Sequence, residues 1–117
     1  EIRLSLVGSE MCIRDSSYVT PKAEGAQVFY YKKSEESKRI AQIMQGILGE
    51  KLGTTRQIKS DVNYYILLHS KLPTIISECG FLSNPEEEQR LCTEEYQEKV
   101  ADALYCGIIE YLMMNMK

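Results

Sequence analysis

The feature that most constrains the fold of this chain is a short apolar run followed directly by a long amphipathic segment. Residues 25–31, Gly-Ala-Gln-Val-Phe-Tyr-Tyr, are rich in the aromatic and β-branched residues that favour a strand. Ser34 then offers an N-cap with Glu35 and Glu36 behind it, and apolar residues recur at helical spacing until Gly53. The sequence therefore predicts a strand and a helix that packs against it.

The rest of the chain continues this alternation. Residues 54–63 are polar and predict a loop, whereas the continuous apolar runs at residues 64–68 and 74–78 predict two strands buried on both faces. Asn84 followed by Pro85 is typical of a helix start, with Glu87 placed for a capping box. Thr93 predicts the cap of a last helix, whose apolar stripe is Tyr96, Val100, Leu104, Ile108 and Leu112. We therefore expect an α/β domain in which helices pack on a sheet.

Length and charge exclude several classes of protein. A chain of 117 residues forms one modest domain, and its net charge of −3 argues against nucleic-acid binding, which needs a basic face. The sequence has no apolar run near the roughly 20 residues that span a bilayer, so we expect no transmembrane segment. Its start does not resemble an export signal. If the protein is exported, we expect the signal upstream of this chain.

Residues 1–16 differ from the rest of the chain. The stretch from Leu6 to Ser16 has neither helical nor alternating periodicity, and it resembles a translated sequencing-adapter tail. We therefore interpret residues 1–16 as a non-native tail and residues 17–117 as the domain sequence. The alternative is a genuine short strand and loop.

The four cysteines and the single histidine do not form a metal-binding pattern. No two cysteines make a Cys-x-x-Cys pair, and His69 is not near any of them in sequence. The cysteines are therefore predicted to be buried free thiols: Cys12, Cys79, Cys92 and Cys106.

Glu78 is the strongest candidate for a chemical role. It ends an otherwise apolar strand, where a carboxylate is costly unless it is paired, hydrated or bound to a metal. Gly80 lets the backbone turn away, so we expect Glu78 to face a crevice at the carboxyl end of the strand. The alternatives are a glutamate paired with a nearby lysine or arginine, or one that caps the next turn.

Three segments resemble one family. Residues 25–31, residues 73–85 with their Glu-Cys-Gly-Phe-Leu-Ser-Asn core, and Glu95-Tyr96-Gln97 resemble the C-terminal half of zinc-dependent N-acetylmuramoyl-L-alanine amidases, most closely the sporulation-associated, cortex-maturing type. The resemblance runs from about Ser17 to the end of the chain. It implies a mixed sheet with flanking helices. It also implies cleavage of the amide between N-acetylmuramic acid and L-alanine in peptidoglycan, outside the cytoplasm, in the cell wall or spore envelope.

The resemblance also implies a zinc site whose ligands this sequence lacks. The family holds zinc with two histidines and a glutamate, and its second histidine, in a Ser-x-His-x-Asn motif, stands just upstream of the segment that matches residues 25–31. That motif is absent here, so no zinc ligand carries over and zinc is expected only in the longer parent protein. The family's catalytic glutamate matches Glu78. In metal-assisted hydrolysis such a carboxylate takes a proton from the attacking water and returns it to the departing amine.

Other polar residues have simpler interpretations. His69 alone cannot make a site that needs three protein ligands, so a loop or surface position is expected. Ser70 and Ser77 lack a His/Asp partner arranged for nucleophilic catalysis. Ser83 and Asn84 are interpreted as helix-capping groups close enough to Glu78 to help orient it.

Two other functions remain open at this point. One is a metal-free homologue that binds cell-wall glycopeptide or a protein partner without cutting it. The other is an unrelated hydrolase built on Glu78 with Asp61 as its second acid. As a piece of an amidase, the chain is expected to expose a sheet edge and to lack activity even with added zinc.

Overall fold

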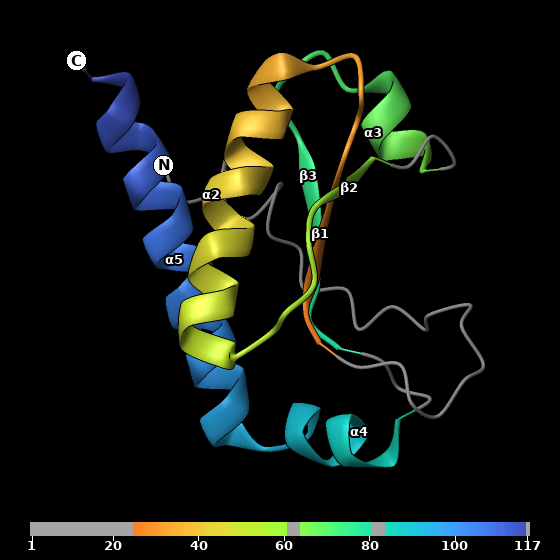
Figure 1. The fold of residues 1–117 in the computed structure, drawn as a ribbon, viewed down its shortest axis with the longest axis vertical. Helices are drawn as coiled ribbons and strands as arrows, with labels where there is room; N and C mark the ends of the chain where they lie inside the picture. Colours follow the sequence, from red (N-terminus) through yellow and green to blue (C-terminus); the bar gives the residue numbers. More distant parts are fainter. Residues whose placement is uncertain (1–24, 61–63, 81–83, 117) are drawn as a thin grey trace.

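The computed structural model describes residues 25–60, 64–80 and 84–116 (Figure 1). In this part of the chain, three strands form one mixed sheet in the order β2-β1-β3, and helices flank it. The elements are β1 (Gln27–Tyr30), α2 (Glu35–Leu52), β2 (Lys59–Ser60), α3 (Tyr65–His69), β3 (Ile75–Glu78), α4 (Pro85–Leu91) and α5 (Glu94–Asn115). The predicted α/β class with a mixed sheet is confirmed. The proposed tail at residues 1–16 lies outside the described residues.

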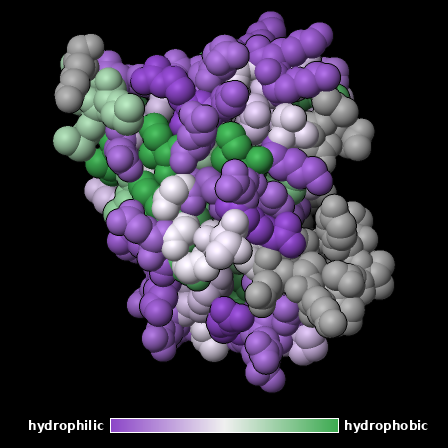
Figure 2. Space-filling view, viewed as in Figure 1, coloured by the Kyte–Doolittle hydropathy of each residue, from purple (hydrophilic) through white to green (hydrophobic). Residues whose placement is uncertain are grey.

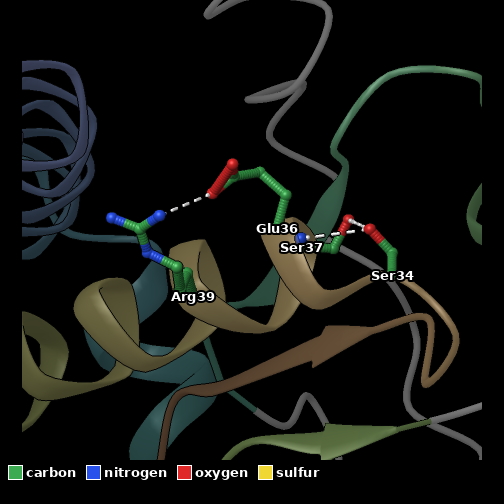
Figure 3. A network of polar contacts seen from close by, with 4 residues as sticks. All are labelled: Ser34, Glu36, Ser37 and Arg39. Atoms are coloured by element: carbon green, nitrogen blue, oxygen red, sulfur yellow. Dashed lines mark hydrogen bonds and ion pairs between the residues drawn. The ribbon is translucent and has the colours of Figure 1, made fainter. Parts of the chain in front are cut away.

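Helix α2 begins and ends where the sequence predicts. The Ser34 hydroxyl accepts a hydrogen bond from the Ser37 backbone N–H at 3.1 Å and donates to the Ser37 hydroxyl at 2.8 Å (Figure 3). Arg39 and Glu36 pair at 3.3 Å on the exposed side of the same turn. At the other end, Gly53 adopts a left-handed conformation with φ of 76°, which glycine tolerates without steric cost.

Two long helices form the core with one face of the sheet. Helices α2 and α5 run side by side in opposite directions, and α2 lies against the sheet (Figure 1). The buried residues between them are small or apolar, and the most enclosed are Val28, Ala41, Leu48, Val100 and Ala103. Burial of this apolar surface is the main stabilising term for the domain.

The pairing of β1 with β3 determines which side chains share a face of the sheet. The two strands are antiparallel, with Gln27 opposite Glu78 and Phe29 opposite Ile76. Val28 is buried in the core with α2, so its neighbours Gln27 and Phe29 point to the opposite face. Glu78 therefore lies on the face of the sheet that points away from α2 and α5.

Several expected elements differ from the structure. Residues 65–69 form helix α3 rather than a strand, because only Leu67 is buried and a short apolar run is compatible with either element. The loop predicted at residues 54–63 contains the short strand β2, which pairs in parallel with β1. Strand β3 is confirmed, but its first three residues are only half-buried.

Helix α5 is confirmed, with Thr93 as its cap, but its buried stripe ends earlier than predicted. Leu112 is exposed, and the buried positions are Val100, Ala103, Leu104 and Gly107. Figure 2 shows hydrophobic residues reaching the surface on the side where α5 lies, among largely hydrophilic surroundings. Within the described residues, no helix has both the length and the apolar character needed to cross a membrane.

Candidate active site

Glu78 is the last residue of β3, and its side chain is buried although it carries a carboxylate. The residue keeps 8% of its surface exposed. Because β3 runs antiparallel to β1, the end of β3 lies beside the start of β1, with Glu78 opposite Gln27. Glu78 therefore stands at the carboxyl end of β3, as expected, and this end lies where the chain enters β1.

The hydrogen-bond partner of Glu78 is a tyrosine hydroxyl. The Tyr64 hydroxyl donates to Glu78 Oε1 at 3.1 Å. Across residues 25–60, 64–80 and 84–116, no lysine or arginine forms an ion pair with Glu78. In the described part of the chain, the alternative of a salt bridge between Glu78 and a lysine or arginine is therefore not observed. The described partner of Glu78 is thus a neutral donor rather than a cation.

The start of β1, which lies beside Glu78, is held by polar side chains from other elements. Gln45 of α2 is buried and accepts from the Val28 N–H at 2.8 Å, while its amide donates to the Ala26 carbonyl at 3.1 Å. The Thr54 hydroxyl also donates to the Ala26 carbonyl, at 2.8 Å. These bonds satisfy backbone groups that would otherwise be costly to bury, and they fix the position of the strand next to Glu78.

A second buried carboxylate, Glu87 of α4, anchors the segment that leads into β1. Its Oε1 atom accepts from the Gly25 N–H at 2.5 Å. The N-cap predicted at Asn84 is confirmed, because the Asn84 side chain accepts from the N–H groups of Glu86 and Glu87. The same helix lies close to Gly80, where a Cβ atom would come within 3.1 Å of Glu87 Oε2. Gly80 has a negative φ, so its role here is to allow this close approach rather than to make a turn.

Cys79 follows Glu78 and is a protonated, unreactive thiol near neutral pH. Burial, and then the negative charge of Glu78, raise the pKa of Cys79 to about 11. The Tyr96 hydroxyl donates to the Cys79 carbonyl at 3.3 Å. Burial, and then the negative charge of Glu87, raise the pKa of Tyr96.

All three described cysteines are free; Cys79 and Cys106 are half-buried, whereas Cys92 is exposed. The prediction of burial is wrong for Cys92 because it caps the C-terminal end of α4 at the surface.

The described residues do not form a metal site by themselves. Within residues 25–60, 64–80 and 84–116, no three histidine, cysteine, aspartate or glutamate side chains are placed to hold a metal ion.

His69 ends α3, is exposed and stacks on Tyr65 with ring centroids 4.0 Å apart, so its predicted surface position is confirmed. Ser70 bonds within its own turn, to Leu72 and Thr74. Asp61 and Ser83 lie outside the described residues.

Comparison with known proteins identifies the family. The N-acetylmuramoyl-L-alanine amidase family matches residues 15–110, which is most of the chain and includes both Glu78 and Tyr64. The chain belongs to this family. The fold agrees, because the catalytic domain of CwlV, an N-acetylmuramoyl-L-alanine amidase from Bacillus (Paenibacillus) polymyxa var. colistinus, aligns with a TM-score of 0.73 and 30% identity over 85% of this chain and 53% of that one.

Two further relatives agree with the type of amidase expected from the sequence. The germination-specific N-acetylmuramoyl-L-alanine amidase of Bacillus subtilis (strain 168) is 41% identical over 77% of this chain and 38% of its own length. The CwlD amidase of Clostridioides difficile, solved in complex with the GerS lipoprotein, aligns with a TM-score of 0.81 and 32% identity over 96% of this chain and 60% of that one. The chain therefore spans 38% of the first of these two relatives and 60% of the second.

Two residues near Glu78 were not assigned to the site from the sequence. The sequence predicts that Tyr64 begins a strand, whereas in the structure it precedes helix α3 and its hydroxyl contacts Glu78. Glu87 was expected only as a capping residue, yet it reaches Gly25, 62 positions away. No local pattern signals either contact, because both join segments that are distant in sequence.

Proposed function

We propose that the complete protein hydrolyses the amide bond between N-acetylmuramic acid and the L-alanine of the stem peptide. The observation that carries the proposal is the position of Glu78. It is a buried carboxylate at the end of β3, within the Glu-Cys-Gly-Phe-Leu-Ser-Asn segment, in a chain of the amidase family. Peptidoglycan is the proposed substrate, and the site of action is outside the cytoplasm, in the cell wall or spore envelope.

We assign to Glu78 the transfer of one proton in two steps. Its carboxylate accepts a proton from the attacking water as the new C–O bond forms at the amide carbon. The resulting carboxylic acid then gives that proton to the nitrogen as the C–N bond breaks. General acid–base catalysis of this kind typically contributes about 10²–10⁴-fold to the rate. The products are a free muramic acid carboxyl group and a stem peptide with a free L-alanine amine.

We further propose that the enzyme uses zinc, held by residues upstream of the segment described here. The described residues do not supply such a site, and the resemblance places the family's ligands before the segment that matches residues 25–31. When bound, the metal would activate water and polarise the amide carbonyl. The upstream gene sequence tests this directly. In-frame Gly-His-Gly and Ser-x-His-x-Asn motifs support it, whereas a start codon just before Ser17 contradicts it.

The activity is tested with the protein encoded by the complete gene, incubated with purified peptidoglycan. The expected result is the release of stem peptides with free L-alanine amines, detected by mass spectrometry, and loss of that release after treatment with a chelator. Activity that survives chelation would instead support a carboxylate-only hydrolase. Binding to peptidoglycan without any release would support a non-catalytic binding module. The Glu78→Gln variant, purified in the same way, tests whether the peptide release comes from this enzyme rather than from a contaminating hydrolase.

A further inference from the structure

We propose that Tyr64 is a positioning residue for the amidase reaction: its hydroxyl orients the Glu78 carboxylate. This inference rests on the proposed function and extends it to a residue with no assigned role. Its basis is the 3.1 Å hydrogen bond from Tyr64 to Glu78 Oε1, which joins a buried carboxylate to a side chain from a different element.

The tyrosine ring is itself held in place by the sheet. It packs edge-on against Phe29 of β1, with ring centroids 5.5 Å apart and an interplanar angle of 60°. Edge-to-face pairs of this kind are favourable and directional. Phe29 is buried and lies on the same sheet face as Glu78, two residues along β1 from Gln27, the cross-strand neighbour of Glu78. The ring therefore has a fixed contact close to the carboxylate that its hydroxyl reaches.

The backbone of Tyr64 is fixed by α3. Its carbonyl accepts from the Leu67 and Leu68 N–H groups at 3.0 and 3.1 Å, so Tyr64 forms the start of the helix. Leu67 is the buried residue of α3 and anchors the helix to the rest of the domain. A side chain held at both its ring and its backbone loses little further freedom when its hydroxyl bonds to Glu78. Such a bond is suited to orientation.

The chemistry of the bond fits a carboxylate that must gain and lose a proton. The hydroxyl engages Oε1, so the geometry assigns the transferred proton to Oε2. When Oε2 is protonated, Oε1 becomes a carbonyl oxygen that still accepts from Tyr64. The same hydrogen bond therefore persists in both halves of the reaction. A lysine or arginine partner would instead favour the ionised form and oppose proton uptake.

The neighbouring residue Tyr65 provides a matched control. It is also a tyrosine on α3, but 75% of its surface is exposed and its ring stacks on His69 rather than on the sheet. Replacing either tyrosine by phenylalanine removes one hydroxyl and retains the ring. Only the variant at Tyr64 loses a bond to Glu78.

The test compares Tyr64→Phe with Tyr65→Phe in the complete enzyme, loaded with zinc. Tyr64→Phe is expected to lower kcat about 5- to 30-fold, the loss expected from removing one buried hydrogen bond, with KM changed by less than about twofold. Tyr65→Phe is expected to match the wild type. A wild-type kcat in Tyr64→Phe, or a raised KM with unchanged kcat, would overturn the inference.

A second measurement does not depend on activity. Tyr64→Phe should lower the Tm of the wild-type enzyme but leave the Tm of a Glu78→Ala variant nearly unchanged, since the acceptor has already been removed. Equal losses of Tm in both backgrounds would show that the hydroxyl acts elsewhere, and would overturn the inference. Failure of the proposed function is a different result: an inactive wild-type enzyme, or a fully active Glu78→Gln variant.

Discussion

The two faces of strand β1 differ in how they are packed. On one face, Val28 lies in a core with α2 and α5, where Leu48 and Val100 are almost fully enclosed by apolar neighbours. On the other face, Phe29 lies beside a buried carboxylate, Glu78, and is covered by a half-buried tyrosine ring. The first face contains little that could react, whereas the second places a proton carrier next to a hydrogen-bond donor.

One face of β1 therefore contributes to the stability of the domain, and the other face carries the candidate catalytic group. The alternation of side chains along β1 assigns neighbouring residues to opposite faces, so the packed face can hold the strand while the other face carries polar groups. We therefore expect substitutions on the α2 face to lower the free energy of unfolding and substitutions near Glu78 to lower kcat. Both expectations apply to the complete protein.

The largest effect is expected from Glu78→Gln, which retains the shape of the side chain but cannot accept and return the proton. We expect kcat to fall by about 10²–10⁴-fold with little change in Tm, measured by release of L-alanine amines and by thermal melting. Glu88→Gln on the exposed side of α4 is the control and should be fully active. A Glu78→Gln enzyme with more than a tenth of wild-type activity, roughly, would contradict the assigned role.

On the packed face, Leu48→Ala should lower the free energy of unfolding by about 2–5 kcal/mol, because it removes a fully buried side chain and leaves a cavity. Denaturant unfolding measures this change. Leu72→Ala is the matched control, since 68% of Leu72 is exposed and its loss should cost under about 0.5 kcal/mol. Equal costs at the two leucines would show that the α2–α5 core does not stabilise the domain.

Alkaline pH should ionise the half-buried thiol of Cys79, which follows Glu78 in the chain. The pKa of Cys79 is raised from 9.0 to about 11, so the folded state favours the neutral thiol. Its contribution to stability is therefore complete below about pH 9 and is lost as the pH rises towards 11. We expect the wild type to lose more free energy of unfolding across this window than Cys79→Ala, by up to about 2–3 kcal/mol.

The same environment should slow alkylation of Cys79. Iodoacetamide is expected to label exposed Cys92 well before Cys79 at pH 8, because the thiolate is the reactive form. Rapid labelling of Cys79 in the folded protein, or identical pH dependence in the Cys79→Ala variant, would disagree with its burial next to Glu78.

Smaller effects of opposite sign are expected at two helical glycines. A Cβ atom on Gly107 would lie 2.6 Å from the sulfur of buried Met44, so Gly107→Ala should destabilise the α2–α5 contact by about 1–2 kcal/mol. Nothing lies within 4 Å of the corresponding atom at Gly46, so Gly46→Ala should stabilise α2 by about 0.5–1 kcal/mol. Changes of the same sign in the two variants would mean that the helices pack less closely than the structure shows.

The elements that could be predicted from the sequence are those with local signals. Caps at Ser34, Asn84 and Thr93 and the glycine stop at Gly53 locate three helices, because each is an interaction within a few residues of the chain. The sequence predicts a strand at helix α3 because this five-residue segment has no side-chain cap and is too short for its periodicity to decide. Its conformation depends on contacts with the rest of the fold.

In the candidate site, too, local features could be predicted from the sequence and contacts between distant segments could not. Glu78 could be identified from its position at the end of an apolar strand and from its motif. Its surroundings could not be, because the antiparallel register of β1 and β3, the Tyr64 hydroxyl and the Glu87 anchor all join distant segments. The sequence contains these residues without indicating that they meet.

We place the proposed reaction on the face of β1 and β3 that points away from α2. A structure of the complete Glu78→Gln enzyme with a bound muropeptide tests it most directly, because that variant should hold the substrate without cutting it. We expect the nitrogen of the muramoyl–alanine amide to lie within about 3.2 Å of the residue 78 side chain, or to be joined to it through one water. A scissile amide held elsewhere, with residue 78 contacting neither the ligand nor a water bound to it, would contradict this assignment.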